Sequence, residues 1–169
     1  MSNVLIGIIG AILFIGLAIG GATFFGPRVS QSTSQGQATV VITQLAGMSN
    51  AVGVRDRETE TATQSGLTSA FLAPAYLAEA PRNPTGGPEP MLLDGSGDLT
   101  GPAGFAAMKI EGSDQDRVCR EISALNNGPA TVPLRSGPDI ARTIGCFRIN
   151  RDLTTDIRNG DHIAYSVVP

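Results

Sequence analysis

The N-terminal segment is the feature that most constrains this chain. From Val4 to Phe25 the sequence carries no charged residue and is rich in Ile, Leu, Phe and Gly. As a helix this run would be roughly 33 Å long, about the hydrocarbon thickness of a bilayer. The remainder of the 169 residues is polar, mixed and rich in glycine. The sequence therefore predicts an apolar stem that carries one head, and any function must fit that division.

The composition of the head limits its partners. The net charge is only −3, and the basic residues, all arginine except Lys109, are scattered along the chain. This pattern argues against nucleic acid as the main partner and against a polybasic membrane patch. The segment after Arg28, about 140 residues, suits one compact domain. Because Trp is absent and aromatic residues are few, we expect a core of Val, Ile, Leu and Ala.

The two cysteines are Cys119 and Cys146. In a chain whose N-terminus inserts into a membrane, two thiols indicate one disulfide formed in an oxidising compartment. The alternative is a pair of buried free thiols.

The apolar run resembles a retained segment more than a cleaved secretory signal. Met1-Ser2-Asn3 supplies no Lys or Arg, and the run is too long for a signal-peptide core. Arg28, the only nearby charge, would by itself place the head in the cytoplasm, which conflicts with a disulfide. A basic leader that has been removed would resolve the conflict.

Glycine punctuates the run and bears on its packing. Gly16 and Gly20 form a small-xxx-small pair, which lets helices approach closely in lipid, although ordinary single-pass anchors also tolerate glycine. The assembly-stem candidates are Val4, Leu5, Gly7, Gly10, Gly16 and Gly20. Because glycine weakens a helix and proline removes a donor, Gly26 and Pro27 predict a kink or an unwound stretch.

The sequence divides into three parts: 1–26, an apolar transmembrane or filament-core helix; 27–58, its amphipathic continuation; and 59–169, the head. Within 27–58, apolar residues recur on one helical face, at Val41, Leu45, Met48 and Val52. Within the head, 59–104 is expected to be an irregular loop region and 105–169 a sheet and disulfide region.

The head is expected to be α+β, with three or four strands. Predicted strands are 91–93, 105–110, 144–149 and 162–168, and a helix is predicted over about 114–126. That helix carries an apolar stripe of Val118, Ile122 and Leu125.

The sequence offers little for catalysis or metal binding. His162 is the only histidine and is expected to be an ordinary strand residue, because one imidazole does not make a zinc site without cysteine ligands. The segment from Asp94 to Asp98 is expected to be a turn rather than a calcium loop, because the later Gly and Glu of such a loop are replaced by Leu99 and Phe105. We therefore expect no enzyme activity, no cofactor and no metal.

Several short stretches together resemble the type IV pilins, particularly the type IVb class. They are the glycine-punctuated start 4–10, the break at 26–27, the amphipathic continuation to Val52, the stretches 76–77 and 81–87, and the cysteine-bearing helix 116–122 with its partner Cys146. The resemblance implies a pilin-like α+β fold: a long N-terminal helix, a small antiparallel sheet head and a disulfide-closed C-terminal region.

The resemblance also implies a route and partners. Pilins of this class are made with a basic leader that a prepilin peptidase removes, so Met1 would be a processed first residue. The chain would rest in the inner membrane, then join copies of itself in an extracellular helical filament through the pilus assembly machinery. Leu5 stands where pilins usually carry glutamate, which favours a minor or tip-like pilin, a divergent major pilin, or a pilin-like subunit that assembles without that charge.

The implied role is that of a structural filament subunit held together by packing of apolar N-terminal helices. The alternative from another class is a non-polymerising, membrane-anchored envelope or virion protein with an exported head. A third reading, a tethered periplasmic binding module, lacks a pocket signature in the sequence.

Overall fold

The computed structural model describes the backbone of residues 2–139 and 141–169, and the side chains of residues 14–15, 31–139 and 141–169. The chain forms two compact units, Met1–Thr33 and Ser34–Pro169. The helix α1, Ser2–Thr59, supplies the first unit and the first element of the second. We refer to the second unit as the head.

The head is built on the second half of α1. The predicted apolar stripe is confirmed, because Val41, Leu45, Met48 and Val52 are all fully buried, together with Ala38. These residues recur every three or four positions, which places them on one face of the helix. That face packs into a core formed with one side of the sheet.

The sheet has five strands in the order β1-β2-β5-β4-β3. The strands are β1 (Met91–Asp94), β2 (Ala103–Ile110), β3 (Leu134–Arg135), β4 (Ile144–Ile149) and β5 (His162–Val167). Antiparallel pairing joins β1 to β2, β2 to β5 and β5 to β4, whereas β3 pairs with β4 in parallel. Phe105 lies opposite Val167 and Ile163 lies opposite Phe147.

The expectation of a small, purely antiparallel sheet with three or four strands is wrong. The fold is α+β in the broad sense, but its sheet is mixed and has a fifth strand, β3. Leu134 and Arg135 are both exposed, so no alternation of buried and exposed residues marks this strand in the sequence. It forms because the chain returning from α2 passes beside β4, where Arg148 donates its N–H to Pro133 O at 2.8 Å.

The transmembrane assignment of 1–26 receives no support from the fold. Of the helical residues whose side chains are described, no stretch is long and apolar enough to cross a membrane. Except for Phe14 and Ile15, the side chains of residues 1–26 lie outside the described residues.

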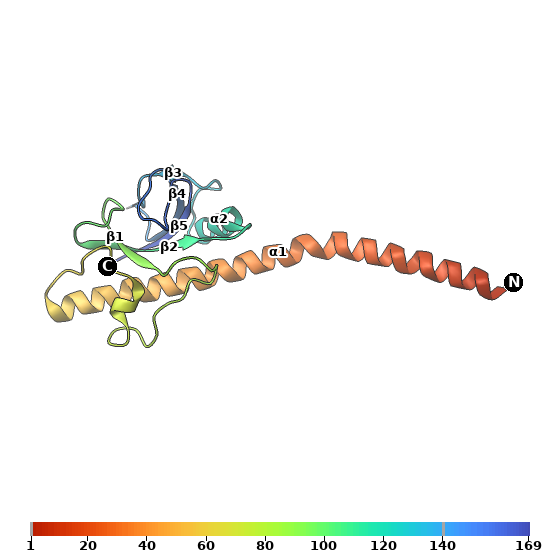
Figure 1. Ribbon diagram of the computed structural model, residues 1–169, viewed down its shortest axis with the longest axis horizontal. Coiled ribbons are helices and arrows are strands. Elements are labelled where there is room, and N and C mark those ends of the chain that lie inside the picture. The colour runs from red at the N-terminus through yellow and green to blue at the C-terminus, as the bar shows by residue number, and fades with distance from the viewer. Residues whose placement is uncertain (1, 140) are drawn as a thin grey trace. The chain divides into compact units, whose positions relative to one another are not determined.

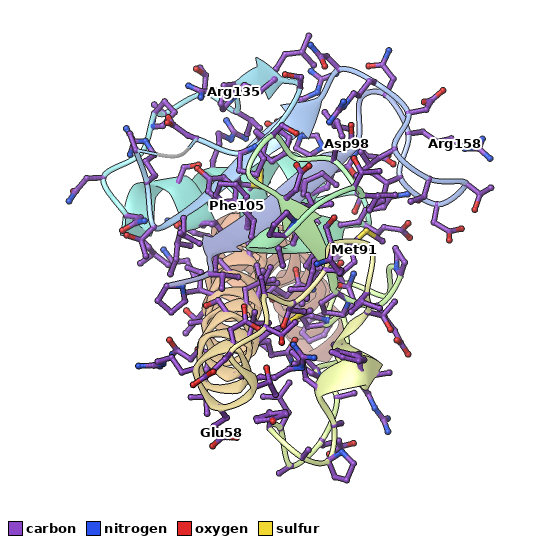
Figure 2. The ribbon with its side chains drawn as sticks, turned by 90° about the vertical axis from the view of Figure 1, so that its left-hand side faces the viewer. Glu58, Met91, Asp98, Phe105, Arg135 and Arg158 are labelled. Carbon is purple, nitrogen blue, oxygen red and sulfur yellow. A yellow bond between two sulfur atoms is a disulfide. The ribbon has the colours of Figure 1, made fainter. Side chains whose placement is uncertain are left out.

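Each face of the sheet carries its own apolar core. One core contains the α1 stripe, the helix α2 (Gln115–Leu125) and inward residues such as Met108 and Ala164. In Figure 1, α1 runs below the strands and α2 lies beside β2. The other core, with Phe105, Phe147 and Tyr165, is covered by loops. Figure 2 shows this loop side, marked by Asp98 and Arg135, away from α1.

The segment expected to be an irregular loop, 59–104, contributes to the sheet. Gly66 N–H donates to Leu92 O and Leu92 N–H donates to Leu67 O, each at 2.8 Å. These bonds cover the outer edge of β1, which would otherwise offer unpaired backbone groups to another chain. A short 3₁₀ helix, Ser69–Leu72, follows and buries Leu72.

The disulfide between Cys119 and Cys146 is confirmed, with the two Cα atoms 5.4 Å apart. It joins α2 to β4 across the first core, and both cysteines are buried. The predicted stripe on α2 is only partly right: Val118 and Ile122 are buried, but Leu125 is 63% exposed. The buried face of α2 instead includes Cys119 and Ser123, because the disulfide turns Cys119 toward β4.

Adjacent valines on α1 test the packing of the stripe. Val41 is fully buried and Val40 is 44% exposed. Val41→Ala should lower the free energy of unfolding by about 2 kcal/mol, because it removes buried methyl groups and leaves a cavity. Val40→Ala, the same change one residue away, should alter it by less than about 0.5 kcal/mol. Urea unfolding of the full-length chain measures both, and equal losses would show that the stripe is misplaced.

Removal of the disulfide tests the link between α2 and β4. The double variant Cys119→Ala/Cys146→Ala should unfold with a free energy about 3–4 kcal/mol lower, because the denatured chain regains the freedom of the closed loop. Reduction of the unaltered chain should produce a similar loss in the same urea titration. An unchanged unfolding midpoint after reduction would contradict this role.

Candidate assembly surface

The proposed stem residues lie on α1, but their side chains are not among those described. Val4, Leu5, Gly7, Gly10, Gly16 and Gly20 have helical backbone within Ser2–Thr59. The two side chains described in this stretch are Phe14 and Ile15, which are 75% and 57% exposed. Covering large, exposed apolar side chains with another apolar surface removes them from water, which is favourable in free energy. Met1 lies outside the described residues.

No unwound stretch is present at Gly26 and Pro27. The helical assignment continues through both residues, so this part of the sequence expectation is wrong. The fixed φ of proline is itself helical, and the lost hydrogen bond is one among many in a long helix. The side chains of both residues lie outside the described ones.

Charged residues at the end of α1 fasten the following chain. Asp56 Oδ1 accepts the N–H of Thr63 at 2.9 Å, and Arg55 Nη1 donates to Thr63 Oγ1 at 2.7 Å. The Arg55 guanidinium also lies 5.0 Å from the ring centre of Phe71, a cation–π geometry. Arg55 and Asp56 therefore order the exit of the chain from α1.

Lys109, the only lysine in the sequence, joins three segments of the head. Its Nζ lies 2.9 Å from Glu111 Oε1 and 3.1 Å from Asp161 Oδ2, and it donates to Asp156 O at 2.7 Å. The Lys109 side chain is only 15% exposed. Burial lowers the pKa of Lys109, but hydrogen bonds and charge attraction from Glu111 and Asp161 outweigh it and raise that pKa above its usual value.

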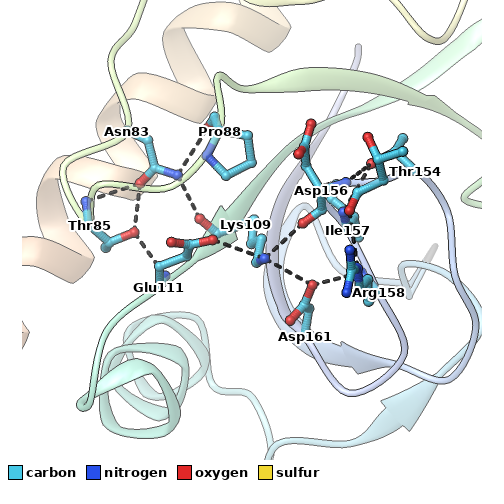
Figure 3. A network of polar contacts seen from close by, with 11 residues as sticks. Asn83, Thr85, Pro88, Lys109, Glu111, Thr154, Asp156, Ile157, Arg158 and Asp161 are labelled. Atoms are coloured by element: carbon cyan, nitrogen blue, oxygen red, sulfur yellow. Dashed lines mark hydrogen bonds and ion pairs between the residues drawn. The ribbon is translucent and has the colours of Figure 1, made fainter.

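The same network reaches the long loop through Asn83 (Figure 3). The Asn83 amide donates to Lys109 O at 2.7 Å and to Pro88 O at 3.0 Å. Its Oδ1 accepts from the N–H of Thr85, whose hydroxyl in turn accepts the N–H of Glu111. These contacts fix the loop 83–88 against the end of β2. These contacts, which we call the Lys109 network, thus join parts of the chain that are distant in sequence.

The remaining polar candidates, His162 and Asp94, lie at strand ends and contact nearby polar groups. His162 begins β5 and is 5% exposed, with Nε2 3.2 Å from Asp116 Oδ1. Asp94 Oδ1 accepts the N–H groups of Ser96 and Asp98, each at 2.8 Å, which confirms the predicted turn. Burial raises the pKa of Asp94, and hydrogen bonds from Asp98 and Ser96 outweigh it and lower that pKa. Within the described residues, no group of three His, Cys, Asp or Glu side chains could hold a metal ion.

Comparison with known proteins found no match: no protein-family model fits the sequence, and no curated protein or solved structure is significantly similar to it.

The sequence indicated the disulfide but not the Lys109 network. Most of this network joins residues that are far apart in sequence, such as Lys109 and Asp161, so no local pattern marks it. The one available signal was the unique lysine set in a predicted strand, two residues before Glu111. Residues i and i+2 share a strand face.

Replacement of Lys109 tests the network. Lys109→Met should lower the free energy of unfolding by about 1–2 kcal/mol, because two carboxylates lose their cationic partner at a site that solvent partly screens. Arg82→Met is the matched control, since Arg82 pairs with Glu79 while 87% exposed, and it should change stability by less than about 0.5 kcal/mol.

The pH dependence of this loss has a definite sign. A raised lysine pKa stabilises the fold fully below the ordinary value of about 10.4, and the contribution is lost as pH rises through the folded-state pKa. The difference between the unaltered chain and Lys109→Met should therefore stay constant near neutral pH and shrink in strong alkali. A difference that grows with alkaline pH would contradict the ion-pair account.

Proposed function

We propose that this chain is a structural subunit of an extracellular filament of the type IV pilus kind, held together by its apolar N-terminal helices. One observation carries the proposal: α1 continues as helix from the head core back to Ser2, through a run without charge from Val4 to Phe25. A helix that is apolar on every side needs apolar surroundings over its whole surface.

The head core supports different roles for the two halves of α1. Among the described residues, the core draws its α1 members from Ala38 to Val52. The uncharged run lies earlier in the sequence, where Phe14 and Ile15 are exposed. Copies of the same helix would bury this run at about 25 cal/mol for each Å² of apolar surface removed from water. The stem would then provide the cohesion of the filament and the head its outer surface.

Glycine suits such a bundle. Gly7, Gly10, Gly16 and Gly20 would let helix backbones approach more closely than larger residues allow. Leu5 places an apolar side chain where pilins usually carry glutamate, so subunit register would depend on shape rather than on a buried charge. This favours a minor, tip-like or divergent subunit.

The remaining features support an exported subunit. A disulfide that joins α2 to β4 forms and persists in an oxidising compartment. In the proposed route a prepilin peptidase processes the chain, and the uncharged run first rests in the inner membrane. The pilus assembly machinery then transfers the stem from lipid to the filament core.

Two glycine variants on α1 test the assembly mechanism. Gly16→Leu should abolish or strongly reduce filaments seen by electron microscopy of cells that express the full chain, because a bulky side chain separates the stems. Gly36→Leu is the control: a Cβ at Gly36 meets no atom within 4 Å, so filaments should persist at near-normal number.

The alternative function predicts a different outcome. A non-polymerising envelope or virion protein would stay inserted in both variants and would form no filament even without substitution. Absence of filaments from cells that export the unaltered, processed chain would contradict the proposal.

A further inference from the structure

A cavity of about 390 Å³ lies beside β4, between the end of α2 and the loop that precedes β4. Its lining includes Asn127, Pro133, Arg135, Arg142, Phe147 and Tyr165. The volume falls within the range of pockets that hold small molecules. It is unrelated to the stem and is not used by the proposed assembly.

One wall of this cavity is a strand edge without a neighbouring strand. β3 pairs only with Arg148 and Ile149, so in the described sheet Ile144–Phe147 has no strand on its outer side. Arg148 directs its N–H outward to Pro133 O, and the backbone groups two residues earlier, on Cys146, face the same side. Ile144 O is held by the Asn126 side-chain amide at 2.6 Å.

The charges at the cavity do not balance. Asp139 Oδ2 lies 3.3 Å from Arg135 Nη2 and 3.7 Å from Arg142 Nε. Arg142 Nη1 also donates to Asn127 O at 3.0 Å. One carboxylate thus faces two guanidinium groups, each with several N–H donors and no acceptor. The surplus is of positive charge and of donors, which suits a ligand rich in acceptors.

The floor of the cavity is fixed by Tyr165. Its hydroxyl donates to Asp139 O at 3.3 Å and accepts the N–H of Asp139 at 3.2 Å. A Cβ at Gly145 would lie 2.6 Å from the Tyr165 hydroxyl, so glycine is what allows this ring to pack there. The tyrosine therefore holds the chain segment that carries Asp139, and with it the two arginines.

We propose that this cavity binds a small carboxylate borne on a hydroxylated ring, the chemical class of the sugar acids. The carboxylate would contact Arg135 and Arg142, for which planar, charge-assisted hydrogen bonds are the favoured geometry. Ring hydroxyls would meet the open backbone groups of β4, and the ring would lie against Pro133 and Phe147. The head would thus carry a ligand site separate from the assembly surface.

The test uses two probes that differ in the carboxylate alone. Sodium glucuronate and glucose are titrated into the full-length chain in detergent solution and followed by amide chemical shifts. Glucuronate should shift the resonances of Cys146 and Arg135, and glucose should bind at least about tenfold more weakly, because it lacks the charge-assisted hydrogen bonds.

Variants assign the binding to the arginines. Arg135→Gln should weaken glucuronate binding about tenfold or more, whereas the exposed control Arg82→Gln should leave it unchanged. Arg135→Lys keeps the charge but loses the planar guanidinium, so its affinity for glucuronate should lie between those of Arg135→Gln and the unaltered chain. It replaces Arg135→Gln in the test if that variant does not fold. Equal binding of glucose, no shift with glucuronate, or full binding by a folded Arg135→Gln or Arg135→Lys variant would overturn the proposal.

Discussion

The rest of the head depends on one apolar contact, the packing of the α1 stripe from Ala38 to Val52 against the sheet. This contact decides which residues of each strand face α1 and which face the opposite core, because side chains alternate along a strand. It also sets the place of α2, whose Val118 and Ile122 enter the same core, and the disulfide then joins α2 to β4. The opposite face of the sheet must consequently be covered by loops, and this is where the second core forms.

The major elements were predictable because each leaves a local pattern. The stripe repeats at helical spacing, and the β1, β2, β4 and β5 strands are apolar runs bounded by turn residues. β3 was not predictable, since two exposed residues carry no alternation and their pairing depends on the path of the chain after α2. Leu125 fits the α2 stripe by spacing, but the disulfide rotates the buried face toward Cys119.

The candidate surfaces also differ in how far the sequence alone predicts them. The uncharged run that we propose as the stem is visible in the sequence alone, because its residues are consecutive. The Lys109 network and the cavity at Arg135 are not, because their members come from separate loops and meet only in the folded head. At Pro27 the local signal for an unwound stretch was outweighed by a long and cooperative helix.

We propose that the head packs against the second half of α1, where the described core residues of this helix lie, and that the first half packs against other copies. Thiol crosslinking at position 14 tests it directly, because Phe14 is exposed and both native cysteines are in a disulfide. In exported, assembled material, Phe14→Cys treated with a short bismaleimide should give a ladder of crosslinked subunits. Monomers alone, in material that is assembled by electron microscopy, would contradict the account.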